Sequence, residues 1–429
     1  MKHCLIITLC TFFAYGAKTQ INDDSLDFYF RETKTAIERA HELWDKNIYG
    51  PVLFVDPVTR QVYANEADTS GVLQKRGNIY TGTLPLKVPV ANTTVNWGGK
   101  SWAMIMLAFL KKDKSYNIAL IAHELFHRSQ ASLGFPMANA PNNFHLDQKN
   151  GRIYLRLELE ALMKAIASSD KKEIEEHVSN ALALRRYRYK LFPKAALHEN
   201  ILELNEGLAA YTGFFISNIE KKKRPDFFRQ RIDDFLKASF VQSFAYNTTP
   251  LYGFLLHEYD KYWNKKINAS TDLTSFFTTA FNVVLPADTA AANEKIGNMY
   301  GRDSIISQES RREQRNQMVV AGYKNSFITM PHFDIPFEKK KVSFDARTIV
   351  TIEDKGLVYP SFTAIDNWGK LNVTEVGGLI NPDRSKVTLT VPLVIDDGSV
   401  TGKGWELQLN PGYMVVKDEL TGNFTLVKK

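Results

Sequence analysis

Residues 117–130, with the sequence NIALIAHELFHRSQ, organise the interpretation of this chain. An apolar run, residues 118–122, leads into His123, Glu124 and, one helical turn later, His127. Residues four apart lie on the same face of a helix, so His123 and His127 can direct two imidazoles at one cation. Glu124 then lies beside that cation. The stretch therefore predicts a helix that carries a metal site, and we interpret the rest of the chain around it.

The length and composition of the chain are those of a globular protein with two or three domains. Its 429 residues are 44% hydrophobic and 24% charged, which is ample for a core. The net charge of +7 comes from 54 basic and 47 acidic residues, a mixed surface rather than the basic stripe of a nucleic-acid-binding module. We interpret the basic runs at 185–194, 221–224 and 339–341 as solvated helix faces and turns. No nucleic-acid partner is predicted.

The first 17 residues have the features of a secretory signal peptide. A short basic head precedes an apolar stretch, residues 4–15, which is too short to span a bilayer and is followed by Gly16 and Ala17. Both cysteines, Cys4 and Cys10, lie in this segment, so any metal in the mature chain must be bound by His, Asp or Glu. No later segment is apolar for long enough to cross a membrane. We predict a protein that is secreted, periplasmic or at the cell surface, with no stable membrane span.

Hydrophobic periodicity predicts an α+β fold with a catalytic domain over 18–335 and a C-terminal β-rich domain over 336–429. Residues 18–110 contain a helix at 23–47 and a small antiparallel sheet. Residues 111–335 are mainly helical. The helices expected after the motif helix are 152–168, 171–192, 199–219, 227–244, 251–263, 271–282 and 304–321. Beyond residue 342, short β-rich runs alternate with turn residues. This pattern predicts an all-β domain, and we expect it to be a sandwich.

Residues 199–213, ENILELNEGLAAYTG, supply candidates for a third metal ligand. Glu199, Glu203 and Glu206 are spaced i, i+4 and i+7 and would line one helix face. Like charges aligned in this way repel each other unless something positive faces them, and a zinc ion bound by two imidazoles and a carboxylate meets that need. We favour Glu206, because the glycine that follows it lets another segment approach closely. Glu203 and Glu158 remain alternatives.

The helix with His-Glu-Leu-Phe-His, followed by a helix with Asn-Glu-Gly-Leu-Ala-Ala-Tyr-Thr-Gly, resembles the gluzincin zinc metallopeptidases. The resemblance implies that His123, His127 and Glu206 bind one Zn²⁺ and that Glu124 is the general base. Glu124 would activate a zinc-bound water that hydrolyses a peptide bond. The match covers two short motifs, and 79 residues separate His127 from Glu206, more than in thermolysin-like members. The resemblance is thus to the clan and not to a closer family.

Further groups are needed around such a metal. The tetrahedral oxyanion of peptide hydrolysis requires a donor besides the metal, and gluzincins often use a Tyr or His. The candidates are Tyr211, Tyr246, Tyr252 and His145. Carboxylates often orient the ligand imidazoles, and Glu203 and Glu158 are the candidates for that role. The strand expected at 100–109 precedes the motif helix, and we expect it to be an edge strand that pairs with an extended peptide.

The expected function is that of an exported zinc-dependent metallopeptidase acting on a peptide or protein substrate. One alternative is a zinc amidohydrolase that acts on a cell-wall bond or another non-peptide amide. Another is a non-enzymatic exported binding protein with a degenerate site. The sequence leaves open the oligomeric state and the choice between endo- and exopeptidase action.

Overall fold

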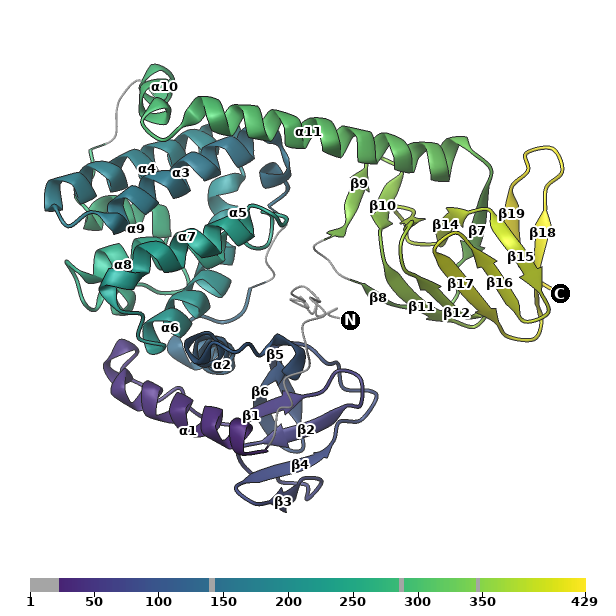
Figure 1. Ribbon diagram of the computed structural model, residues 1–429, viewed down its shortest axis with the longest axis horizontal. Helices are drawn as coiled ribbons and strands as arrows, with labels where there is room; N and C mark the ends of the chain where they lie inside the picture. Colours follow the sequence, from purple (N-terminus) through teal and green to yellow (C-terminus); the bar gives the residue numbers. More distant parts are fainter. Residues whose placement is uncertain (1–22, 139–142, 285–288, 345–347) are drawn as a thin grey trace. The chain divides into compact units, whose positions relative to one another are not determined.

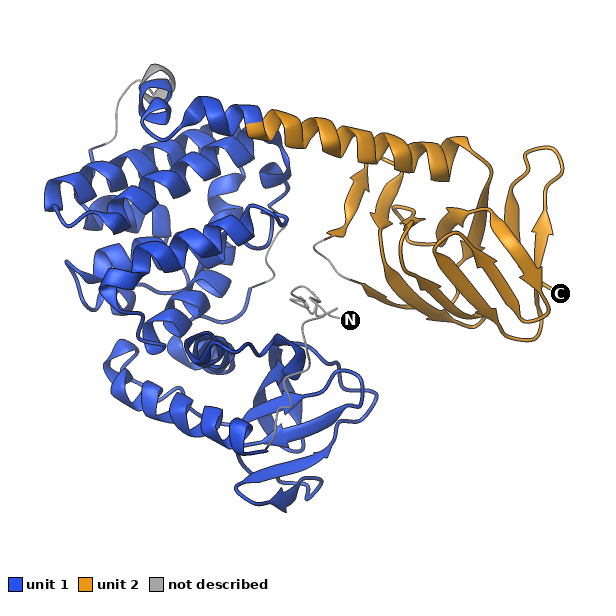
Figure 2. Cartoon of the chain, in the orientation of Figure 1, with its two compact units in different colours: residues 1–307 blue, residues 308–429 orange. Residues whose placement is uncertain are grey.

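The computed structural model describes residues 23–138, 143–284, 289–344 and 348–429 (Figure 1). The chain forms two compact units, residues 1–307 and 308–429 (Figure 2). The predicted signal peptide, residues 1–17, lies outside the described residues. The division precedes residue 335, where we expected the boundary, because strand β7 (His332–Pro336) pairs with β14 (Lys386–Thr390) and β19 (Phe424–Lys428) inside the second unit.

The first unit contains one sheet with the strand order β3-β4-β2-β1-β6-β5. Its strands are β1 (Val52–Val55), β2 (Gln61–Ala64), β3 (Gln74–Arg76), β4 (Ile79–Thr83), β5 (Thr93–Trp97) and β6 (Lys100–Met106). All pairs are antiparallel except β1 with β6. The prediction of an edge strand at 100–109 was wrong, because β6 lies between β1 and β5. A tight hairpin at Gly98 and Gly99, both with positive φ, folds β5 back along β6 and makes β5 the edge.

The two faces of this sheet pack into different cores because side chains alternate along a strand. Val52, Phe54, Ala103 and Ile105 face helices α1 (Asp23–Arg39) and α2 (Lys114–Ser129), whereas the alternate residues of β1 and β6 form a second core with loop residues. Helix α2 packs on β6, on α1 and on α6 (Leu208–Ile216). The motif helix is therefore central to this unit.

Helices form the rest of the first unit (Figure 1). They are α3 (Lys149–Ala167), α4 (Lys171–Leu191), α5 (Ala195–Leu202), α6 (Leu208–Ile216), α7 (Arg224–Phe235), α8 (Ala245–His257), α9 (Leu273–Ala280) and α10 (Thr289–Asn298). A π-helical turn, Glu203–Gly207, joins α5 to α6. Helix α10 was not predicted, and α7 ends at Phe235 rather than at 244. Helix α8 begins at Ala245 rather than at 251, with Pro250 inside it.

Two sheets form the β part of the second unit, with orders β18-β19-β7-β14-β13-β10-β9 and β15-β16-β17-β12-β11-β8. The remaining strands are β8 (Lys341–Phe344), β9 (Val350–Ile352), β10 (Gly356–Tyr359), β11 (Phe362–Asp366), β12 (Gly369–Val373), β13 (Gly378–Ile380), β15 (Pro392–Asp396), β16 (Ser399–Gly402), β17 (Trp405–Leu409) and β18 (Tyr413–Lys417). Side chains from both sheets share one core. Helix α11 (Arg302–Lys324) leads into this unit. The α+β class and the C-terminal β domain are confirmed.

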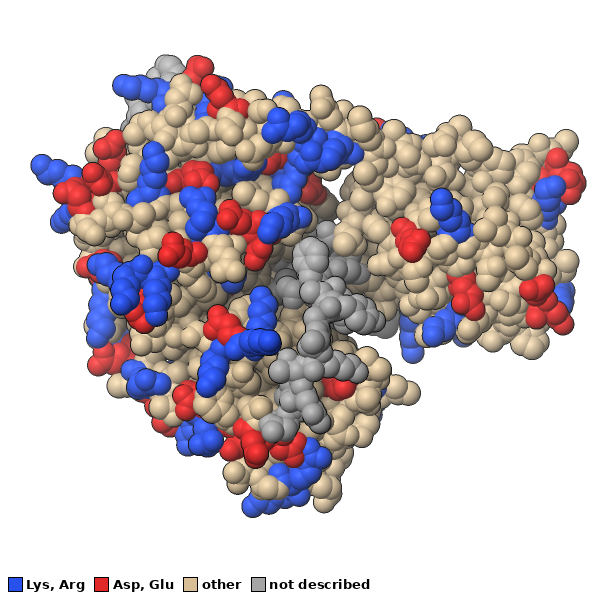
Figure 3. All heavy atoms as spheres, viewed as in Figure 1, with Lys and Arg blue, Asp and Glu red and all other residues tan. Residues whose placement is uncertain are grey.

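Charged side chains of both signs are interspersed over the visible face of the first unit, and few lie on the visible face of the second (Figure 3). Among helices of the described residues, none has both the length and the apolar character that crossing a bilayer requires.

Candidate metal centre

Three side chains converge where α2 meets the π turn. The Nε2 atoms of His123 and His127 lie 3.0 Å apart, and Oε2 of Glu206 lies 3.4 Å and 3.3 Å from them. The three side chains are only 10%, 9% and 15% exposed. They form a group that can hold a metal ion, and it is the one cluster of three or more such residues in the described parts of the chain.

The spacing of these atoms matches what a tetrahedral zinc requires. Two ligand atoms bound at 2.0–2.1 Å to a tetrahedral ion lie about 3.3 Å apart. The observed separations of 3.0, 3.3 and 3.4 Å are close to that value. Two imidazoles and one carboxylate are also a donor set of catalytic zinc sites. The residues present therefore fit such an ion without rearrangement of the backbone.

A hydrogen-bonded chain fixes the orientation of His127. Its Nδ1–H donates to Oε1 of Gln130 at 2.8 Å, which turns Nε2 towards the group. The amide of Gln130 in turn donates to Asn205 at 2.7 Å, and Asn205 contacts Oε1 of Glu206 at 3.4 Å. Gln130 and Asn205 are buried, so the chain of bonds ties both ends of the site together in a dry environment.

Glu124 is a buried carboxylate beside the group. The residue is 3% exposed, and its Oε2 atom has no hydrogen-bond partner among the described residues. Burial raises the pKa of Glu124 to about 8, although His127 acts in the opposite direction. Burial alone would lower the pKa of His127, but the charge and hydrogen bond of Glu206, together with Glu124 and Gln130, outweigh burial and raise that pKa to about 9. With a pKa of about 8, the carboxyl group of Glu124 can exchange a proton close to neutral pH.

Tyr246 is the predicted tyrosine that the structure brings to this group. It lies in the first turn of α8; its hydroxyl donates a hydrogen bond to Oε2 of Glu206, and its ring stacks on His123. Tyr252 donates instead to Glu158 at 3.1 Å, and Tyr211 accepts a hydrogen bond from Trp263 at 3.1 Å. Both of these tyrosines are fully buried in the helical core.

The π turn decides which glutamate reaches the histidines. An i→i+5 turn rotates the residues after it relative to the α-helix before it, so Glu206 does not share the face of Glu199 and Glu203. The following glycine lets α8 come close, because a Cβ on Gly207 would lie 2.1 Å from Oγ1 of Thr249. The close approach that we expected at this glycine is present, and it brings the first turn of α8 against the π turn.

The positive groups that face the other two glutamates are arginines. Arg185 binds both carboxylate oxygens of Glu203 at 2.9 and 2.8 Å, and Arg188 binds Glu199 at 2.7 and 2.6 Å. Glu158 bridges the two guanidinium groups, at 2.7 Å from each. The alternatives of Glu203 or Glu158 as metal ligand, or as partner of the ligand imidazoles, were therefore wrong. These five side chains are completely buried, and a buried guanidinium requires a carboxylate.

The same network contains His145, whose Nε2 lies 2.7 Å from Oε1 of Glu199. His145 is therefore not the oxyanion donor that we considered. The network also corrects our interpretation of the basic run 185–194 as a solvated face. Arg185 and Arg188 are three residues apart and therefore lie on one face of α4. Together with the glutamates on α3, α5 and the π turn, this spacing was the sequence signal for a buried network. Gln130 and Asn205 were also missed, and nothing in the sequence distinguishes them from other polar residues.

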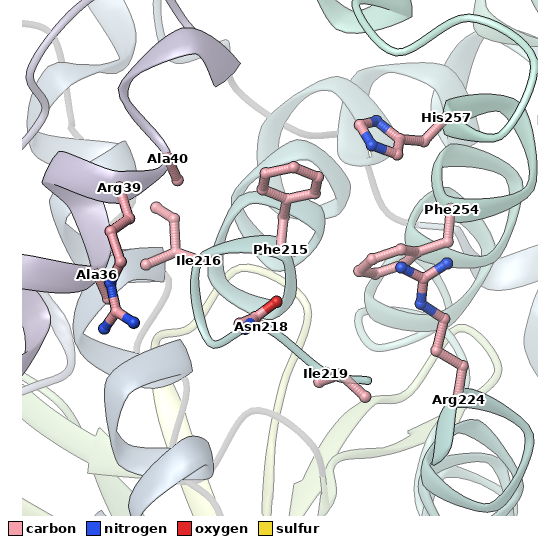
Figure 4. Close-up of a pocket in the computed structure, with 10 residues that line it drawn as sticks. All are labelled: Ala36, Arg39, Ala40, Phe215, Ile216, Asn218, Ile219, Arg224, Phe254 and His257. Atoms are coloured by element: carbon pink, nitrogen blue, oxygen red, sulfur yellow. The ribbon is translucent and has the colours of Figure 1, made fainter. Parts of the chain in front are cut away.

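A separate pocket of about 310 Å³ lies among α1, α6, α7 and α8 (Figure 4). Arg39, Phe215, Arg224 and His257 are among the residues that line it. In Figure 4, Arg224 lies beside the ring of Phe254, and the guanidinium is 4.6 Å from the ring centroid. No member of the metal-binding group lines this pocket, so its shape says nothing about that group.

Comparisons with protein-family models, with curated proteins and with solved structures found no match to this chain. The feature of this chain that bears on function is the pair of histidines and the glutamate that can bind a metal ion.

Proposed function

We propose that this protein is a zinc-dependent metallopeptidase. The observation that carries the proposal is the convergence of two imidazoles and one carboxylate beside a second, unpaired carboxylate, that of Glu124. Zinc is favoured because calcium and magnesium prefer oxygen ligands, whereas nitrogen supplies two of the three donors here. When bound, zinc polarises a carbonyl and lowers the pKa of a water molecule towards neutrality.

Glu124 is the residue to which we assign proton transfer. Its carboxylate takes a proton from the attacking water and delivers it to the amine that leaves. The unpaired Oε2 atom and the pKa of about 8 in the metal-free protein support this role, because a group that both accepts and donates a proton is most effective when its pKa is near the working pH. A nearby cation lowers this pKa and so prepares the carboxylate form.

Tyr246 is the residue to which we assign support of the oxyanion. Its hydroxyl already lies against the glutamate of the metal-binding group, and its ring is held in place by the stack on His123. This hydroxyl can transfer its hydrogen bond from Glu206 to a negative oxygen that develops next to the metal-binding group. The assignment replaces Tyr211 and Tyr252, which are completely buried beside Trp263 and Glu158 and contact no member of that group.

An extended peptide would pair with β5. This strand is an edge of the sheet and packs against α2, so a peptide added to it would run along the motif helix. Strand β6 cannot take this part, because both of its edges are already paired.

Metal analysis combined with hydrolysis of a peptide library tests the proposal. We expect one zinc per chain, hydrolysis that stops on treatment with a chelator, and a Glu124→Gln variant that keeps its zinc but is inactive. Glu220→Gln, at an exposed position outside the site, is the control and should behave as the wild type. Absence of bound zinc, or hydrolysis that persists in Glu124→Gln, would overturn the proposal. Zinc binding without hydrolysis of any peptide would equally contradict a peptidase.

A further inference from the structure

Arg231, on α7, is a cation without a counter-ion. Within the described ranges no carboxylate forms an ion pair with it and no group accepts a hydrogen bond from it, and its buried Nε atom has no partner. Asp234, three residues later, attracts Arg231 electrostatically but forms its ion pair with Lys237, at 2.9 Å. The other arginines of α7 differ in this respect, because Arg224 binds Glu258 and Arg229 binds Glu160.

Aromatic rings hold the guanidinium of Arg231 in place. Its central carbon lies 4.3 Å from the ring centroid of Phe214 and 5.7 Å from that of Phe227. Stacking uses the flat face of a guanidinium and leaves its N–H edge available for a planar anion. The Nε atom is buried, but Arg231 as a whole is only partly buried.

This guanidinium belongs to the surroundings of the metal-binding group. Phe214 directly follows Gly213, at which α6 lies so close to α2 that an added Cβ would be 3.5 Å from the Cβ of His123. Burial lowers the pKa of His123, and the charge of Arg231 lowers it further. Burial also raises the pKa of Tyr246 well above its usual value, and the same charge opposes that rise. The positive charge therefore acts on both residues.

A third side chain extends this region along α2. Tyr116 lies seven residues before His123, so both point from the same face, about 10 Å apart along the axis. Burial raises the pKa of Tyr116, and the charge of Arg231 opposes that rise. The Lys111 ammonium lies 4.0 Å from the centre of the Tyr116 ring and adds a second positive charge.

The charges of the loaded site leave Arg231 uncompensated. A divalent ion is balanced by Glu206 and by the carboxylate form of Glu124. Among the described residues no carboxylate then forms an ion pair with Arg231, although Asp234 attracts it. A partly desolvated guanidinium is stabilised when a carboxylate binds its N–H edge.

We propose that Arg231 binds a carboxylate of the peptide substrate and so makes this site selective for acidic substrates. The inference rests on the proposed peptidase function. The carboxylate has two sources, the C-terminus of the peptide or an Asp or Glu side chain near the scissile bond. Both present the same planar anion to the guanidinium, with the Tyr116 hydroxyl as an additional donor.

Matched peptides separate these sources. One series compares a free C-terminus with its amide, and the other compares Glu with Gln at each position beside the cleaved bond. We expect kcat/KM of the wild type to favour one carboxylate form about 10- to 100-fold, mainly through KM. In Arg231→Gln this ratio should fall to near one, and in Arg231→Lys it should be partly retained. Arg229→Gln, on the same helix, should leave the ratio unchanged.

The ratio between two peptides is insensitive to partial unfolding, which lowers both rates equally. Binding of the same peptides to zinc-loaded Glu124→Gln protein, measured by calorimetry, makes the test independent of turnover. Equal affinity of the wild-type site for the acid and neutral forms in both series would overturn the carboxylate site even if peptides are cleaved. A preference that survives Arg231→Gln would overturn it too. Failure to cleave any peptide, with the binding preference intact, would count against the peptidase and not against Arg231.

Discussion

The ring of Tyr246 stacks on the imidazole of His123, with ring centroids 5.5 Å apart and an interplanar angle of 16°. The same tyrosine donates its hydroxyl to Glu206. One side chain of α8 therefore contacts a ligand candidate from α2 and another from the π turn. This contact joins the parts of the site that are far apart in sequence, and it leads to the first prediction.

Tyr246→Phe keeps the ring and the stack but removes the hydroxyl. We expect kcat/KM on a good peptide substrate to fall about 10- to 100-fold while one zinc per chain is retained. Tyr252→Phe is the matched control, because Tyr252 lies on the same helix and also donates to a glutamate, Glu158. That variant should lose about 1–3 kcal/mol of stability with little change in kcat/KM. An equal loss of activity in both variants would contradict a specific role for Tyr246.

Glu206→Gln removes the carboxylate charge of the metal-binding group. We expect zinc affinity, measured by competition with a chromogenic chelator, to fall by at least about 100-fold, because the amide is a weaker ligand than the carboxylate. Glu203→Gln should keep full zinc stoichiometry, since Glu203 binds Arg185 instead. The assignment of the third ligand fails if Glu203→Gln, rather than Glu206→Gln, releases the metal.

The metal-free protein should show a pH dependence that comes from Glu124. Burial raises the pKa of Glu124 from 4.5 to about 8, so the folded state holds a proton that the unfolded state releases. Its contribution to stability is therefore lost as the pH rises from about 4.5 to 8. Glu124→Gln cannot lose that proton. The Tm of Glu124→Gln minus that of the wild type should increase between pH 5 and pH 8 in chelator, and bound zinc should reduce the increase.

His127 titrates in the same experiment but is common to both proteins. Its pKa is raised to about 9, so its stabilising effect is complete below pH 6.5 and declines as the pH approaches 9. Taking the difference between the two proteins therefore isolates most of the Glu124 effect. A difference in Tm that is independent of pH would contradict the shifted pKa of Glu124.

Arg185→Met tests the buried ion-pair network. The change leaves Glu203 and Glu158 without their shared cation, and we expect a loss of about 3–5 kcal/mol in the free energy of unfolding. Arg229→Met breaks the exposed pair with Glu160, whose arginine side chain is 41% exposed, and should lose less than about 1 kcal/mol. Urea denaturation of the two variants checks the difference. Similar losses in both would mean that burial of the network contributes little.

The sequence alone determined the motif helix, the acidic helix that supplies the third ligand candidate, and the order of sheet, helices and β domain. These features depend on local periodicity. His123 and His127 share a face in any α-helix because they are four residues apart, and the alternating runs beyond residue 342 bury a face only as strands. Such rules hold whatever the rest of the chain does.

Only the tertiary structure decided which charged groups meet. Glu199, Glu203 and Glu206 are alike in sequence, but the π turn separates Glu206 from the other two, and the arginines of α4 bind those two. Tyr246 was one of several equivalent tyrosines until the packing of α8 against Gly207 brought it to the site. The physical reason is that ion pairs between distant segments depend on how the helices pack. Local sequence periodicity does not determine which cation a given carboxylate will contact.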